Sequence, residues 1–175
     1  MLQLLLLRHA KAERGQSGGR DHERRLDERG RRDAPKLGAY IAKHGYAPDQ
    51  VIVSTAARTR ETWSLAAAAM PGKPEVAFDE RIYESTPDAL LAVLREADAK
   101  VRTLMMVGHN PGMEELAGQL VATGDIETRQ RMQEGFPTSA LAVIEFALDR
   151  WDRVHPQSGR LEHFITPRSI AEPAD

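Results

Sequence analysis

The 175-residue sequence contains no cysteine, so disulfides and thiolate catalysis are excluded. This absence fits a reducing compartment. Aromatic residues make up only 5% of the chain, but 41% hydrophobic and 29% charged residues are ordinary for a globular enzyme. A chain of this length can bury one hydrophobic core. We therefore expect a single domain over residues 1–166 and a flexible tail over 167–175.

An excess of charge of either sign is also missing, because the formal net charge is −2. Without a general basic field, neither nucleic acid nor an anionic membrane is an expected partner. The apolar run at residues 1–7 is too short for a signal peptide and has no positive residues before it. No apolar run approaches the 18 or so residues that would span a bilayer. The expected location is the cytoplasm.

The hydrophobic pattern alternates between strands and helices. Strands are predicted over residues 2–8, 49–53, 75–78, 101–107, 139–147 and 160–166, and helices from Asp27, over 55–70, after Thr86 and over 112–121. Such alternation predicts a three-layer α/β/α sandwich with a mostly parallel central sheet. Pro35 is expected to kink the first helix or to break it near Ala34. Residues 11–25 are expected to form a long surface loop.

Polar groups of one kind follow three of these strands. Arg8 and His9 follow the first, Arg58 lies just after the second, and His109 with Asn110 follows the fourth. The carboxyl ends of parallel strands meet at one edge of a sheet, where ligands usually bind. Arginine matches phosphate oxygens in a bidentate manner, and imidazole can donate to them or attack phosphorus. The pattern predicts a phosphoryl site, with the amides of the helix after Asn110 favouring an anion nearby.

Three segments together resemble the motifs of the histidine phosphatase (phosphoglycerate mutase-like) superfamily. Residues 6–10 (Leu-Leu-Arg-His-Ala) resemble its Arg-His-Gly motif, with alanine in place of glycine. Residues 54–62 resemble its second arginine motif, and 107–111 (Val-Gly-His-Asn-Pro) its second histidine motif. The short length, the Arg-His-Ala opening, and segments 25–30, 82–83 and 108–112 are most similar to the small SixA-type phosphohistidine phosphatases.

The resemblance implies a role for each matching residue. His9 would be the nucleophile that carries the phosphoryl group, Arg8 and Arg58 would clamp phosphate, and His109 would donate to the transferring oxygens. The chemistry asks for a neutral His9 and favours a protonated His109. Glu80 aligns with the segment where mutase-like members carry their general acid. A surface glutamate is an equal interpretation of Glu80, because phosphohistidine can release its imidazole with little help. No metal or other cofactor is implied.

Three functions remain open at this point. The first is a phosphatase acting on phosphohistidine in a protein, or on a small phosphoramidate or phosphomonoester, with inorganic phosphate as product. The second is a mutase-like phosphotransferase, although the chain is short of the insertions that shield such a site from water. The third is a non-catalytic module that binds phosphate or a phosphopeptide. The segments that would choose the substrate, 11–25 and 123–138, contain no recognisable motif.

Overall fold

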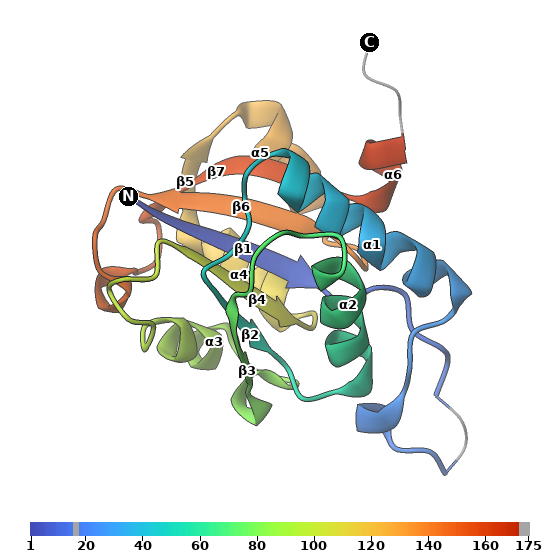
Figure 1. The fold of residues 1–175 in the computed structure, drawn as a ribbon. Helices are drawn as coiled ribbons and strands as arrows, with labels where there is room; N and C mark the ends of the chain where they lie inside the picture. Colours follow the sequence, from blue (N-terminus) through green and yellow to red (C-terminus); the bar gives the residue numbers. More distant parts are fainter. Residues whose placement is uncertain (16–17, 172–175) are drawn as a thin grey trace.

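The computed structural model describes residues 1–15 and 18–171 (Figure 1). The strands are β1 (Leu2–Arg8), β2 (Gln50–Val53), β3 (Glu75–Phe78), β4 (Thr103–Gly108), β5 (Val121–Gly124), β6 (Leu141–Phe146) and β7 (Gly159–Ile165). The α-helices are α1 (Glu28–Lys43), α2 (Ala57–Ala67), α3 (Pro87–Leu94), α4 (Gly112–Leu120), α5 (Ile126–Glu134) and α6 (Pro167–Ala171). Short 3₁₀ turns cover Asp21–Glu23, Glu80–Ile82 and Trp151–Arg153. Within these ranges, no helix is long and apolar enough to cross a membrane.

All of these strands belong to one sheet with the order β3-β2-β4-β1-β6-β7-β5. The pairs β2–β3, β2–β4 and β1–β4 are parallel, while β6 runs antiparallel to both β1 and β7. Strand β5 then pairs in parallel with β7. Since β6 is the strand of this sheet that runs against the others, the predicted mostly parallel sheet is confirmed.

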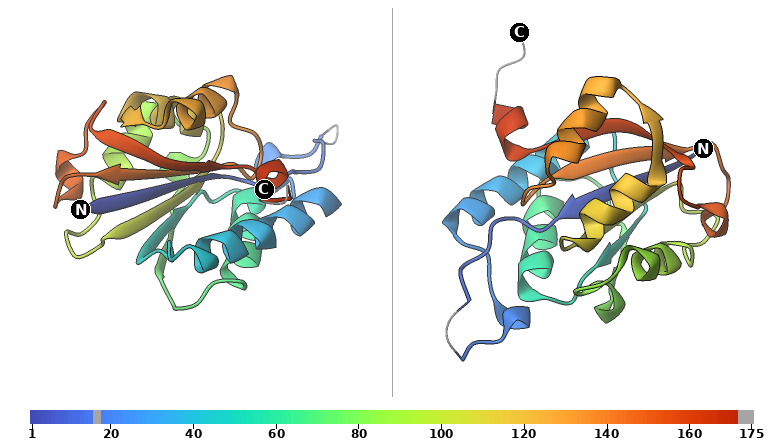
Figure 2. Two further views of the ribbon diagram at one scale, coloured as in Figure 1. Left: turned by 90° about the horizontal axis from the view of Figure 1, so that it is seen from above. Right: turned by 180° about the vertical axis from the view of Figure 1, so that it is seen from behind.

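Helices cover both faces of the sheet, as Figure 2 shows from above. Successive leucines of β1 point to opposite faces, as in any strand. Leu4 and Leu6 pack in the cluster that contains residues of α3, α4 and α5. Leu5 and Leu7 pack in the cluster with residues of α1 and α2. A strand buried on both faces needs an unbroken apolar run, and this accounts for the leucines at the start of the sequence.

The first helix begins as the sequence predicts but is not broken by its proline. The Asp27 side chain accepts a hydrogen bond from the Gly30 amide at 2.8 Å, which caps the helix. Helix α1 then continues through Pro35 to Lys43. Of the two expected alternatives, a kink or a break near Ala34, the break is therefore wrong. Proline removes one helical hydrogen bond, whereas the buried face formed by Ala34, Leu37 and Ile41 stabilises the continuous helix.

Two segments are more ordered than their sequences suggest. The motif-free stretch after residue 121 forms β5 and α5, and Met132 is the residue of α5 that is buried. A helix with so little apolar surface gives no periodic signal. Part of the expected flexible tail forms α6, whose Ile170 packs against the core cluster on the α1 side. The remaining tail residues, 172–175, lie outside the described residues.

The contact between α1 and α2 depends on a glycine. A methyl group at Gly38 of α1 would overlap the Ala66 carbonyl of α2, whereas one at exposed Gly118 of α4 would meet nothing within 4 Å. We expect Gly38→Ala to lower the free energy of unfolding by about 1–3 kcal/mol. Gly118→Ala should raise it by up to about 1 kcal/mol, because alanine favours helix. Urea unfolding of both variants tests this, and equal effects would contradict the close approach of the helices.

Candidate active site

The polar residues after three strands meet because those strands are neighbours. Strand β4 lies between β1 and β2, and all three run in the same direction. The pairing extends one residue beyond the strands: the amide of His9 donates to the Gly108 carbonyl at 3.1 Å, and that of Ser54 to the Val107 carbonyl at 3.0 Å. The rings of His9 and His109 consequently lie 5.3 Å apart, measured between centroids.

His9 is held in one tautomer. Its Nδ1 lies 2.7 Å from the carbonyl oxygen of Ala10. Because a carbonyl can only accept, Nδ1 carries the hydrogen and Nε2 keeps its lone pair. The Thr62 hydroxyl fixes the surrounding backbone, since it accepts from the Ala10 amide at 2.9 Å and donates to the Arg58 carbonyl at 2.7 Å. His9 therefore presents an unprotonated nitrogen from a rigid position.

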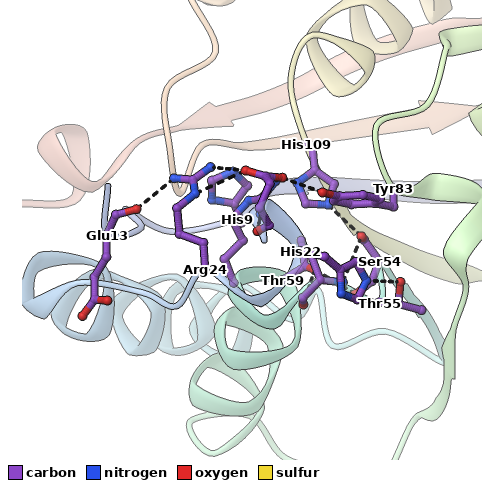
Figure 3. A network of polar contacts seen from close by, with 12 residues as sticks. His9, Glu13, His22, Arg24, Ser54, Thr55, Thr59, Tyr83 and His109 are labelled. Atoms are coloured by element: carbon purple, nitrogen blue, oxygen red, sulfur yellow. Dashed lines mark hydrogen bonds and ion pairs between the residues drawn. The ribbon is translucent and has the colours of Figure 1, made fainter. Parts of the chain in front are cut away.

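Both histidines of the pair are neutral at physiological pH. Burial, followed by the charges of Arg58 and Arg8, lowers the pKa of His9 to about 4. Burial and the charge of Arg58 lower the pKa of His109 to about 3. The expectation of a protonated His109 is thus wrong for the protein without ligand, because burial, and then the nearby arginines, disfavour a charged ring. His109 Nε2 lies 2.7 Å from the Ser54 hydroxyl (Figure 3).

Arg8, Arg58 and His109 share one feature. Each has one polar edge bonded to the protein and another buried nitrogen without a partner. Arg8 Nη1 donates to the Phe136 carbonyl at 3.0 Å, and Arg58 donates from Nη1 and Nη2 to Asp21 at 2.9 and 3.0 Å. Within the described residues, the unpartnered nitrogens are Nε of both arginines and Nδ1 of His109. Unpaired buried polar groups are rare, and an anion with several acceptor oxygens would satisfy these.

These groups line a cleft of about 300 Å³. Its lining includes Arg8, His9, Lys11, Asp21, Arg24, Arg58, Glu84, His109 and Asn110. Four of these side chains are basic and two are acidic, so a cationic site exists locally on a chain of net negative charge. A larger groove of about 1110 Å³ runs beside α2 from His22 to Phe78, but it contains neither His9 nor His109. The smaller cleft is the candidate active site.

The chain is similar to known proteins in both sequence and fold. Residues 4–90 match the family described as the histidine phosphatase superfamily (branch 1). The chain is 34% identical to an uncharacterized protein of Mycobacterium leprae over 149 residues, which is 85% of this chain and 89% of that one. A crystal structure assigned as phosphohistidine phosphatase SixA of Agrobacterium tumefaciens is 31% identical with a TM-score of 0.80, covering 95% of this chain and 98% of that chain. The chain belongs to the histidine phosphatase superfamily.

A second solved structure extends the likeness. The protein histidine phosphatase SixA complexed with tungstate has a TM-score of 0.77 and covers 97% of this chain and 99% of that one. At 17% identity it demonstrates the shared fold alone. The superfamily and the Agrobacterium tumefaciens SixA structure together support a phosphatase activity with a phosphorylated substrate and phosphate as product.

Two of the residues expected in this histidine phosphatase site, Glu80 and Asn110, do not offer free polar groups to the cleft. Glu80 is exposed on its 3₁₀ turn and does not line the cleft, whereas Glu84, four residues later, does. Glu84 has a left-handed backbone with φ of 48°, a strained conformation that often occurs at functional sites. Asn110 lines the cleft, but its amide nitrogen donates to the Phe136 carbonyl at 2.8 Å, and its oxygen accepts from the Glu114 amide at 3.3 Å. Asn110 thus ties α4 to the loop that also holds Arg8.

Besides Glu84, the sequence interpretation gave no role to two residues at the cleft, Tyr83 and Asp21. Tyr83 donates to Asp21 Oδ2 at 2.5 Å, and its ring lies edge-on to His109 with centroids 5.3 Å apart. Asp21 also accepts from Arg58. Tyr83 lies in the segment 82–83 that resembles the family, but no role was assigned to it. Asp21 stands in a charged loop where nothing in the sequence distinguishes it from its neighbours.

The lowered pKa values give a direct test of the site without substrate. We expect the ring proton signals of His9 and His109 to titrate with midpoints near pH 4 and 3, so that both rings stay neutral as the pH falls from 7 to 5. The measurement is ¹H–¹³C NMR of histidine-labelled protein, with assignments from His9→Ala and His109→Ala. A midpoint for His9 above pH 6 would contradict a neutral nucleophile held by burial.

Proposed function

We propose that the protein is a phosphohistidine phosphatase that works through a covalent intermediate on His9. Its substrate would be phosphohistidine in a protein, or a small phosphoramidate or phosphomonoester. The observation that carries the proposal is a buried imidazole with a fixed tautomer, beside three buried nitrogens that lack partners. The first group suits attack on phosphorus, and the others suit the oxygens of a phosphoryl group. The likeness to SixA structures supports this substrate class.

In the first step, His9 Nε2 attacks phosphorus and forms a P–N bond. The bond from phosphorus to the substrate nitrogen breaks, and its electron pair leaves with the imidazole. That imidazole departs neutral when its other ring nitrogen carries a hydrogen. Arg8 and Arg58 neutralise charge on the equatorial oxygens, which is the main contribution a protein makes to phosphoryl transfer.

In the second step, water attacks phosphorus and the bond to His9 breaks. Inorganic phosphate leaves, and the electron pair returns to Nε2. The low pKa of His9 favours this step, because a nitrogen that holds protons poorly is also a good leaving group. His109, neutral in the free protein, can donate from Nδ1 to a phosphoryl oxygen in the tautomer that carries its hydrogen there, and Ser54 then donates to Nε2.

The nucleophile is tested by trapping the phosphoenzyme. With a radiolabelled phosphohistidine peptide at neutral pH, we expect an acid-labile, base-stable label that turns over to free phosphate. His9→Ala should abolish the label. Arg58→Ala should slow its formation by roughly 100-fold or more through the loss of transition-state charge stabilisation.

The matched control for this assay is His155→Ala, since His155 is exposed and does not line the cleft. Undiminished turnover in His9→Ala would remove His9 as the nucleophile. A stable label without phosphate release would favour a phosphotransferase, and phosphate binding without a label would favour a non-catalytic module.

The position of Glu84 predicts which carboxyl group helps the leaving group. An alkoxide needs a proton, whereas a neutral imidazole does not. We therefore expect Glu84→Gln to slow hydrolysis of an alkyl phosphate by about 10-fold or more while leaving phosphohistidine hydrolysis within about twofold. Glu80→Gln should change neither rate by more than about twofold, because Glu80 does not line the cleft. A selective loss in Glu80→Gln would return the acid role to that residue.

A further inference from the structure

Asp21, in the loop before α1, accepts hydrogen bonds from three side chains, those of Arg58, Tyr83 and Arg24. Its Oδ2 accepts from Arg58 Nη2 at 3.0 Å and from the Tyr83 hydroxyl at 2.5 Å. Its Oδ1 accepts from Arg24 at 3.1 and 3.3 Å, and its backbone oxygen accepts from Arg58 Nη1 at 2.9 Å. A residue that is two-fifths exposed thereby holds a guanidinium that is almost fully buried.

Arg58 is held by a charged carboxylate, whereas Arg8 and His109 are held by neutral groups. Arg8 is held by the Phe136 carbonyl, and His109 by the Ser54 hydroxyl. Both residues are bonded to the protein at one nitrogen, and a second buried nitrogen, Nε of Arg8 or Nδ1 of His109, is left for a ligand. The terminal edge of Arg58 is bonded twice to Asp21, which leaves its Nε edge for the phosphoryl oxygens. Asp21 thus fixes the direction in which Arg58 offers its remaining hydrogens.

The carboxylate is unsuited to proton transfer in this arrangement. The hydrogen bond from Tyr83 and the neighbouring arginines hold the pKa of Asp21 well below its usual range. Both oxygens are already occupied by donors from Arg58, Tyr83 and Arg24. A carboxylate that remains ionised and saturated can orient its partners but cannot supply a proton.

We propose that Asp21 is a positioning residue for the phosphoryl site. It holds Arg58 by its terminal edge and, through Arg58 and Tyr83, fixes the loop before α1 against the cleft. This inference rests on the proposed function for its meaning in catalysis. Its structural part concerns the binding of phosphate, which needs no turnover.

The sign of one binding change tests the proposal. Removing a negative charge from an anion site would by electrostatics alone tighten phosphate binding. Loss of the clamp on Arg58 would weaken it, because a charged hydrogen bond is no longer aimed at the ligand. We expect the dissociation constant of inorganic phosphate, measured by calorimetry, to rise about 10-fold in Asp21→Asn. Glu23→Gln, which removes the same charge from the same 3₁₀ turn outside the cleft lining, should stay within about twofold.

A second variant separates the clamp from the charge. Tyr83→Phe keeps the carboxylate and removes only the 2.5 Å donor to it, so the net charge of the site is unchanged. We expect phosphate binding in this variant to weaken in the same direction, by about threefold. Thermal unfolding of each variant establishes whether it is folded. If Asp21→Asn is not folded, phosphate binding by Tyr83→Phe tests the proposal alone.

Phosphate binding that is unchanged or tighter in folded Asp21→Asn would overturn the proposal and show the carboxylate to be a competitor of phosphate. If Asp21→Asn is not folded, unchanged binding in Tyr83→Phe would overturn it equally. Failure of the proposed function has a different signature: wild-type protein would form no label on His9, while the order of phosphate affinities among the variants would still be measurable.

Discussion

The histidines and buried arginines of the cleft depend on the parallel pairing of β4 with β1 on one side and β2 on the other. This pairing brings the residues that follow β1, β2 and β4 together at the carboxyl ends of these strands. The hydrogen bonds of the ladder continue through the amides of His9 and Ser54, so these residues begin the loops with little freedom. Because the leucines of β1 are buried on both faces, the position of the nucleophile is fixed by the core itself.

The site combines two buried guanidiniums with two imidazoles, and the charge of the guanidiniums helps to keep the imidazoles neutral. Burying arginine is costly unless its hydrogens are bonded, and the Phe136 carbonyl and Asp21 meet part of that need. The positive charge that remains adds to burial in keeping His9 and His109 unprotonated. The same arrangement that leaves the site incomplete without an anion therefore also keeps the nucleophile ready.

The loop before α1 completes the site from outside the sheet. Ala12 pairs with Leu26 across the base of this loop, and the Leu26 amide donates to Glu61 of α2 at 3.0 Å. Leu26 itself is fully buried. These contacts anchor both ends of a segment whose sequence is otherwise charged and rich in glycine. Asp21, between these ends, can consequently reach Arg58 and Tyr83 even though its side chain is partly exposed.

The sequence by itself determined the alternation of strands and helices, the caps at Asp27 and Thr86, and the grouping of Arg8, His9, Arg58 and His109. These features are local, or follow from the rule that parallel strands end at one edge. Only the tertiary structure decided that α1 continues through Pro35, that α5 forms, that His109 is neutral, that Glu84 rather than Glu80 reaches the cleft, and that Asp21 clamps Arg58. Packing, burial and contacts between distant segments set each of these, and none leaves a periodic or motif signal in the chain.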